Sequence, residues 1–237
     1  MKRINCFIPF QDAAQVAHTV KGLKESDLVS KIYLLATETV SDAPEGCTVV
    51  PVQSLNSTDA VRKIAALADA DYTMLYTKYT SLELGMFALE RMLHIADDSA
   101  AGMVYADHYI VTNGTAKNNP VISYQQGSLR DDFNFGSVLI YNTSVLKEAV
   151  AQMTADYQFA GLYDLRLKAS QKASLVHINE YLYSEVEQDT RKSGEKIFDY
   201  VDPKNRAVQI EMEEACTQHL KAIGGYLAPE FRQIEFN

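Results

Sequence analysis

The chain opens on Ile4-Asn5-Cys6-Phe7-Ile8-Pro9, a short apolar run that ends at a proline. Because proline removes a backbone donor and the run is short, this pattern predicts a strand. Apolar residues then recur at helical spacing, at Val16, Ala17, Val20 and Leu23. The next apolar run, from Lys31 to Leu35, predicts a second strand, so the chain begins as strand, helix, strand.

The same alternation continues along the chain. Asn56 to Asp59 supply N-cap chemistry for a helix, and Tyr72 to Tyr76 form another β-rich run. Apolar spacing predicts a further helix from about Leu82 to Ala96, and the next strand begins at Met103. This β-α-β-α-β rhythm is typical of a mainly parallel sheet.

A hairpin signal makes the predicted sheet mixed. Asn113-Gly114 lies between the apolar runs Tyr109 to Val111 and Val121 to Ser123. Asn-Gly suits a type I′ turn, because both central residues of that turn need positive φ. We therefore expect an antiparallel hairpin arm beside the parallel strands.

The last third of the chain continues the α/β pattern. Ser137 to Tyr141 and Leu175 to Ile178 predict strands, and Asn142 is a candidate cap for the helix that follows the first of them. A terminal helix is expected after Pro203, ending at Gly224-Gly225. We predict a single domain over residues 1–237, which could be the first module of a longer protein with a second domain beyond it.

Composition limits the partners. The 237 residues carry 22 basic and 31 acidic side chains, a net charge of −9, without a basic stripe for a phosphate backbone, so nucleic acid is not expected. The cysteines Cys6, Cys47 and Cys216 are odd in number and widely spaced, which favours a reducing, cytoplasmic location. No run approaches the roughly 18 apolar residues of a membrane span. Peripheral attachment to a membrane remains open.

Three stretches together resemble family 2 glycosyltransferases in order and spacing: Ile8 to Asp12, Lys31 to Leu35, and Arg62 to Tyr76. Gly161 to Leu167 is similar to the later Glu-Asp-x-x-x-x-Arg region of that family. The resemblance implies an α/β GT-A fold, with a mixed, mostly parallel sheet flanked by helices. It also implies inverting transfer of a sugar from a nucleotide-sugar donor to a glycan or lipid-linked acceptor, at the inner face of the membrane.

A longer string, Tyr124 to Gly136 followed by Glu180 to Asn205, resembles a subgroup found in Bacteroides-type bacteria. Residues implied for nucleotide-sugar binding by the resemblance are Pro9, Asp12, Arg62, Thr77, Lys78 and Asp107.

The resemblance fails at the acidic motifs. The family uses an Asp-x-Asp-like motif to hold a divalent cation, Mg²⁺ or Mn²⁺, on the donor diphosphate, but here the position reads Tyr76 to Thr80, without an acid. The second strand leads into Ala36-Thr37-Glu38 where the family has acidic residues. Lys78 could replace the cation as a fixed positive charge on the leaving diphosphate. Alternatively, Lys78 is a surface lysine on a degenerate site.

Asp164 is the predicted catalytic base, because the resemblance places it in the region that carries the family's base. Its position between Leu162 and Leu165 is one in which a carboxylate can be half-buried and raised in pKa. The alternative is an aspartate ion-paired within its helix, for example with Arg166.

Asp107 and His108 follow a buried strand, at the edge where α/β sheets collect ligands. They could hold a cation or orient a sugar hydroxyl; alternatively they are a polar strand exit that leads into the hairpin. His177 is interpreted as a core histidine.

Arg130, Asp131, Asp132 and Phe135 combine a guanidinium, carboxylates and an aromatic ring, the mixture that binds sugars. A capped loop over buried aromatics is the alternative. The Asp131-Asp132 pair is also a candidate substitute metal site. The segment Glu185 to Lys192 has the composition of a solvated mixed-charge stretch, although the resemblance implies that Arg191 and Lys192 contact the diphosphate.

Other catalytic motifs, such as phosphate loops, Gly-x-Ser-x-Gly elbows and His-Glu-x-x-His, do not occur. The sequence therefore leaves three hypotheses. The first is a glycosyltransferase. The second is a non-catalytic GT-A-like module that binds a glycan or a partner domain. The third is a nucleotidyltransferase-like domain, which would need a Gly-rich loop and acidic ligands that this chain lacks.

Overall fold

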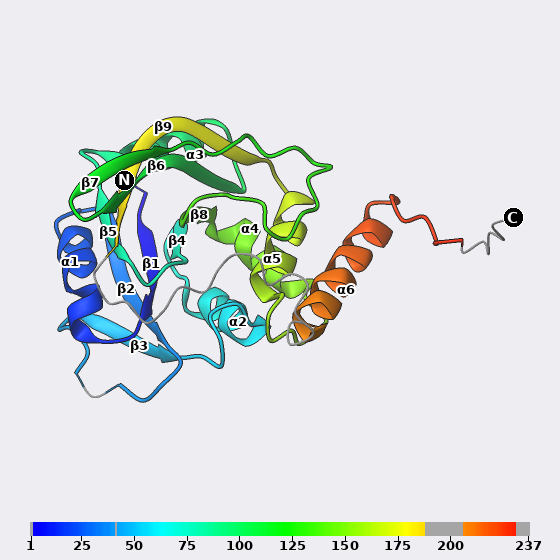
Figure 1. Cartoon of the computed structure of the whole chain (residues 1–237), viewed down its shortest axis with the longest axis horizontal. Helices are drawn as coiled ribbons and strands as arrows, with labels where there is room; N and C mark the ends of the chain where they lie inside the picture. The colour runs from blue at the N-terminus through cyan, green and yellow to red at the C-terminus, as the bar shows by residue number, and fades with distance from the viewer. Residues whose placement is uncertain (1, 41, 188–205, 231–237) are drawn as a thin grey trace, which may run out of the picture.

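A mixed sheet runs through the molecule between two layers of helices (Figure 1). The computed structural model describes residues 2–40, 42–187 and 206–230. The strands are β1 (Ile4–Phe10), β2 (Val29–Ala36), β3 (Cys47–Pro51), β4 (Tyr72–Tyr76), β5 (Ser81–Leu84), β6 (Met103–Thr112), β7 (Thr115–Asn119), β8 (Val138–Asn142) and β9 (Leu175–Val186). The helices are α1 (Ala13–Lys24), α2 (Thr58–Leu67), α3 (Ala88–Asp98), α4 (Thr143–Ala151), α5 (Gly161–Ser170) and α6 (Arg206–Ala222).

The strand order is β3-β2-β1-β4-β8-β6-β9-β5, with β7 paired to β6. Strands β1 to β4 are parallel, β8 lies antiparallel between β4 and β6, β9 is parallel to β6, and β5 is antiparallel on β9. The predicted mixed, mostly parallel sheet is therefore confirmed. The carboxyl ends of β1, β2, β4 and β6 lie at one edge, where open α/β sheets bind their ligands.

Burial explains why the chain opens on an apolar run, because all seven residues of β1 are buried. Ile4, Cys6 and Ile8 pack in the cluster that includes α1 and α3, whereas Phe7 packs in the cluster that includes α2, α4 and α5. Successive residues of a strand point to opposite faces, so a strand covered on both sides needs apolar residues throughout.

Short-range sequence signals set several boundaries. Ser57 caps α2 by accepting from the Ala60 N–H at 3.2 Å, and Asn142 caps α4. Asn113 and Gly114 have φ of 51° and 74°, as a type I′ turn requires, and join β6 to β7 as the predicted hairpin.

The predicted helix from Leu82 is wrong at its start. Residues 81–84 instead form the edge strand β5, and α3 begins only at Ala88. Pairing with β9 overrides the local apolar spacing, and the Gly85 N–H donates to the Leu182 carbonyl at 2.8 Å. Phe87 then turns the chain with a φ of 56°. Strand β9 likewise runs to Val186, beyond the predicted end at Ile178.

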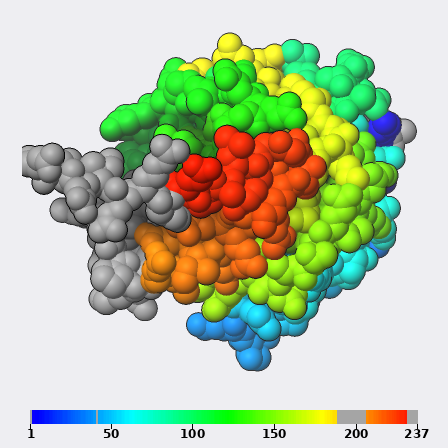
Figure 2. Space-filling model, turned by 90° about the vertical axis from the view of Figure 1, so that its right-hand side faces the viewer, coloured from blue at the N-terminus to red at the C-terminus, as the bar shows by residue number. Residues whose placement is uncertain are grey.

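Helix α6 packs against α5 and buries Ala215 and His219, as expected for a terminal helix on the core. Figure 2 shows it in orange along the surface of the molecule. Within the three described ranges, no helix combines the length and the apolar character that a membrane crossing requires.

Candidate functional site

A cavity of about 740 Å³ opens where β4, β6 and β9 meet the 131–136 loop and the start of α5. Its polar lining comes from widely separated parts of the chain. Residues that carry it include Thr77, Lys78, His108, Asp131, Asp132, Asn134, Arg166 and Glu185. The cavity thus gathers several residues that the sequence singled out separately.

Thr77 and Lys78 follow β4 directly, at the place where the sequence resemblance leads one to expect an acidic motif. The Thr77 N–H donates to the Ser137 carbonyl at 3.0 Å, which continues the antiparallel pairing of β4 with β8. This bond fixes the backbone that carries Lys78 into the cavity lining. The strand end therefore brings one positive charge, and no carboxylate, to this edge of the sheet.

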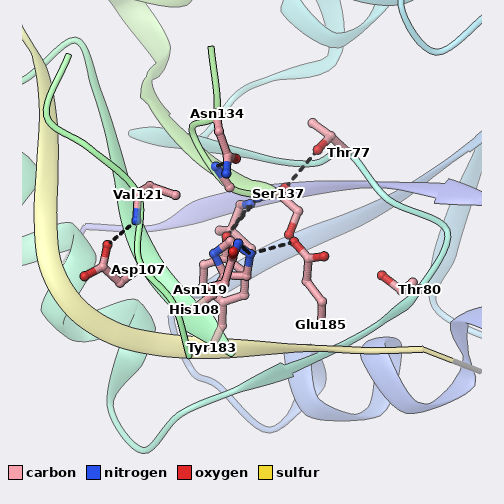
Figure 3. Close-up of polar contacts among 12 residues, drawn as sticks. Thr77, Thr80, Asp107, His108, Asn119, Val121, Asn134, Ser137, Tyr183 and Glu185 are labelled. Carbon is pink, nitrogen blue, oxygen red and sulfur yellow. Dashed lines mark hydrogen bonds and ion pairs between the residues drawn. The ribbon is translucent and has the colours of Figure 1, made fainter. Parts of the chain in front are cut away.

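His108 and Glu185 form a buried pair in the cavity wall (Figure 3). The His108 Nε2 lies 3.2 Å from the Glu185 Oε1, with the two side chains 2% and 10% exposed. The His108 ring also stacks on Tyr183 at 4.8 Å, and Asn119 contacts its Nε2 at 2.8 Å. Burial alone would raise the pKa of the Glu185 carboxyl, but His108, the Ser137 hydroxyl beside it and the Lys78 charge lower that pKa below its ordinary value.

Asp107 lies beside His108 in sequence but takes no part in this pair. Its Oδ1 accepts from the Val121 N–H and contacts the His177 Nε2, each at 2.8 Å. Figure 3 shows Asp107 turned toward Val121 while His108 turns toward Glu185. Since neighbouring residues of a strand face opposite ways, the predicted Asp107–His108 metal pair is wrong. His177, interpreted as a core histidine, has a side chain that is 8% exposed, stacks on the Tyr105 ring and contacts Asp107, in agreement with that interpretation.

The described residues do not gather a ligand set for a divalent cation. Across the part of the chain that the structure describes, no three His, Cys, Asp or Glu side chains gather as metal ligands. Asp132, half of the candidate substitute site, accepts two hydrogen bonds from Arg130 at 2.8 and 2.7 Å. The Arg130 guanidinium holds the pKa of Asp132 below its usual range.

Asp164, the predicted base, does not line the cavity. It is 1% exposed and pairs with Lys168 one turn further along α5, so the helix-internal ion pair considered as its alternative is the arrangement found, with Lys168 in place of Arg166. The side of α5 that faces the cavity carries Leu162, Tyr163 and Arg166. This placement does not suit a base for an incoming acceptor, because the acceptor could not reach the carboxylate.

Arg166 is a site residue that the sequence did not assign to the cavity. Its guanidinium donates to the carbonyls of Ser128 and Arg130 at 3.2 and 2.9 Å and lies 4.8 Å from the Tyr163 ring centre. A buried guanidinium with these partners fixes the loop that carries Asp131 and Asp132. The sequence signal for this placement was the spacing: Arg166 follows Leu162 by one helical turn, so both lie on the same side of α5.

Residues 131–135, predicted to bind a sugar, lie in the lining of the cavity. Asp131 is exposed at the cavity, whereas Phe135 is 8% exposed and packs edge-on against Tyr105 at 4.8 Å. The predicted contact of a sugar with the Phe135 face is therefore limited, because that ring belongs mainly to the core.

Four predicted donor-site residues lie outside the cavity lining, Asp107 among them. Of the other three, Pro9 is buried within β1, Asp12 caps α1 by accepting from the Gln15 N–H, and Arg62 pairs with Asp156. Arg62 also donates to the Met153 carbonyl at 3.1 Å, so its role is to tie α2 to the end of α4. Arg191, together with Lys192, lies outside the described residues.

Glu185 is the functional candidate that the sequence missed. It was assigned to a solvated segment, yet it is buried in β9 at 7% exposure. The signal was the spacing of Tyr183 and Glu185, which places the carboxylate on the same side of the strand as a buried tyrosine.

Comparison with solved structures identifies the fold. The structure is similar to S. aureus TarS 1-349, with a TM-score of 0.56 and 9% identity over 78% of this chain and 60% of that one. It is also similar to S. aureus TarS 1-349 in complex with UDP-GlcNAc, with a TM-score of 0.61 and 12% identity over 92% and 66% of the two chains. This chain thus spans less than two thirds of the chains it matches.

No protein-family model matches the sequence, and no curated protein matches it. The structural matches, together with the strand order, show the GT-A fold that the sequence resemblance predicted.

Proposed function

We propose that this GT-A domain is a nucleotide-sugar glycosyltransferase that works without a protein-held divalent cation. The observation that carries the proposal is the cavity at the carboxyl end of β4, with Lys78 in its lining at the position of the family's metal motif. A fixed ammonium there can offset the negative charge that grows on a diphosphate leaving group. A structural neighbour binds UDP-GlcNAc, so a UDP-linked sugar is the first donor to test.

The proposed reaction is a single in-line displacement. A hydroxyl oxygen of the acceptor forms a bond to the anomeric carbon, while the bond from that carbon to the diphosphate breaks and the nucleoside diphosphate leaves with the electron pair. We assign the acceptor proton to Asp131, because this carboxylate lines the cavity and is exposed at its mouth. One displacement inverts the anomeric centre. A cell-surface glycan or its lipid-linked precursor as acceptor, and a cytoplasmic location at the membrane, are parts of this proposal.

Calorimetric titration with UDP and GDP, with and without Mn²⁺, tests the donor half of the proposal. We expect UDP to bind with an affinity that Mn²⁺ leaves unchanged. Affinity that appears only with Mn²⁺ would overturn the cation-independent site. The absence of binding for either nucleotide would overturn the donor site itself.

A non-catalytic module that binds a glycan or a partner domain is the second candidate. It is favoured by one observation: the cavity side of α5 presents Leu162 and Tyr163, whereas the resemblance leads one to expect a catalytic carboxylate from this helix. Slow hydrolysis of UDP-GlcNAc, measured as released UDP, separates the two. If the protein is a transferase, we expect it to hydrolyse UDP-GlcNAc slowly and Asp131→Asn to reduce the rate. Asp164→Asn should leave the rate per folded protein unchanged. A module that binds UDP-GlcNAc without turnover would support the second candidate.

A further inference from the structure

Glu185 is a cavity carboxylate for which the proposed displacement has no use. It is the last inward-facing residue of β9 and lines the cavity with Lys78 and Asn134. Burying a carboxylate costs free energy unless it is hydrogen-bonded or paired. A buried, charged group at a ligand cavity therefore needs a structural or a binding reason.

The surroundings hold this carboxylate in one position. His108 contacts its Oε1 and is itself held between the Tyr183 ring and Asn119. The Tyr183 hydroxyl accepts from the Ser137 N–H at 2.8 Å, which fixes the ring on which His108 stacks. Gly136 completes the cluster, because a Cβ there would lie 2.3 Å from the Tyr183 hydroxyl. Such support from neighbouring side chains is what pre-organises a binding group.

The tautomer of His108 follows from its neighbours. A carboxylate only accepts hydrogen bonds, so the contact with Glu185 requires a proton on Nε2. The Asn119 Nδ2 lies 2.8 Å from the same nitrogen, so the Asn119 amide must turn its oxygen toward a protonated Nε2. His108 thus uses one Glu185 oxygen, and the carboxylate keeps acceptor capacity for a ligand in the cavity.

We infer that Glu185 binds hydroxyl groups of the donor sugar and selects a neutral sugar over a sugar acid; this inference rests on the proposed function. Ionised carboxylates form charge-assisted hydrogen bonds with hydroxyl donors. Among the described residues, three carboxylates line the cavity, Asp131, Asp132 and Glu185, whereas the cationic side chains of the lining are Lys78 and Arg166. Arg166 is committed to backbone carbonyls, and the proposed function assigns Lys78 to the diphosphate. A uronic acid would therefore bring a second negative charge next to Glu185 without a cation of this described lining to match it.

Titrations of the whole chain with UDP, UDP-glucose and UDP-glucuronic acid test the inference. The variant is Glu185→Gln, which keeps the size of the side chain and removes its charge. The control is Glu187→Gln, two residues along the same chain, where the carboxylate accepts from Thr112 and is not part of the cavity lining. Thermal melting of each variant confirms that the compared proteins are folded.

We expect the wild-type protein to bind UDP-glucose about tenfold or more tightly than UDP-glucuronic acid. Glu185→Gln weakens UDP-glucose by about tenfold, leaves UDP unchanged and removes most of the discrimination against the sugar acid. Glu187→Gln changes none of the three affinities. The UDP measurement isolates the sugar contribution from the nucleotide contribution.

Two results overturn the inference while the donor site stands. One is an equal loss for UDP and both sugars in Glu185→Gln, which would mean that Glu185 acts by positioning Lys78. The other is unchanged discrimination between the two sugars. If wild-type protein binds none of the three compounds, the proposed function fails and the inference fails with it. Should Glu185→Gln not fold, Glu185→Asp, which withdraws the carboxylate by one methylene, must show the same selective loss for UDP-glucose.

Discussion

Two carboxylate–histidine pairs join the same two strands, β6 and β9, and they lie in different surroundings. In one pair β6 supplies the acid and β9 the histidine, Asp107 with His177; in the other the roles are exchanged, His108 with Glu185. Asp107 also accepts from the backbone of Val121, so its pair fastens the chain after β7 to the sheet. The second pair lines the cavity.

The difference follows from the pleat of a strand. Asp107 and His108 are adjacent, and alternation sends them to opposite faces of β6. One face is closed by the 121–124 segment, where the Tyr124 N–H donates to the Tyr105 hydroxyl at 2.7 Å. The other leads to the cavity. The same pair of chemical groups is thus expected to govern stability on one face and ligand binding on the other.

The largest expected effect is loss of stability in Asp107→Ala. The substitution leaves the buried Val121 N–H and His177 without their acceptor, and each lost partner costs about 1–3 kcal/mol, so we expect a loss of about 3 kcal/mol in the free energy of unfolding. Urea denaturation measures it. UDP binding by the folded fraction should persist. If Asp107→Ala kept wild-type stability and lost UDP binding, the Asp107–His177 pair would be the one that serves ligand binding, contrary to this expectation.

Gly136→Ala should cost about 2–3 kcal/mol and also disturb the cavity face. Gly136 has a φ of 71°, which disfavours a side chain, and the new Cβ would lie 3.1 Å from the His108 Nδ1 as well as against Tyr183. Gly127→Ala is the matched control, since a Cβ added at Gly127 would have no atom within 4 Å. Equal melting temperatures for the two variants would mean that the cluster around His108 is loosely packed.

The β-α-β half of the fold was readable from the sequence because local rules decide it. The apolar run from Ile4 to Pro9, the Ser57 cap and the Asn113-Gly114 turn each depend on neighbours within a few residues. Residues 81–84 were misassigned because their partner, β9, lies about a hundred residues further along, and pairing at that distance leaves no local trace.

The site was less readable, because it depends on which way each side chain faces. Thr77, Lys78 and Asp131 were found from the resemblance and from composition, and all three line the cavity. Asp164 was misassigned, because Lys168 could not be recognised as its partner before the burial of α5 was known. Glu185 was hidden in a charged stretch, although the alternation with Tyr183 was present.

Lys78→Met should weaken UDP binding by about tenfold, the effect of about 1.4 kcal/mol expected when one charge is removed from a diphosphate contact. Lys172→Met, at an exposed position between α5 and β9, is the matched control and should bind UDP as the wild type does. Binding of wild-type protein should weaken with added salt, and that dependence should decline in Lys78→Met. An unchanged affinity for UDP in Lys78→Met would mean that Lys78 at this face of the cavity does not bind the diphosphate.

The smallest expected effect is a pH-dependent difference in stability between wild type and Glu185→Gln. Because the pKa of Glu185 in the folded chain lies below its ordinary value of 4.5, the ionised carboxylate contributes stability that is fully present above that value. This contribution is lost as the pH falls through the lowered pKa, where the folded protein must take up the proton. Urea denaturation from about pH 5 downward should therefore show the stability gap closing on acidification. A gap that widens on acidification would mean that burial prevails over His108 and Lys78, so that Glu185 is a structural acid like Asp107 and the two faces do not differ in kind.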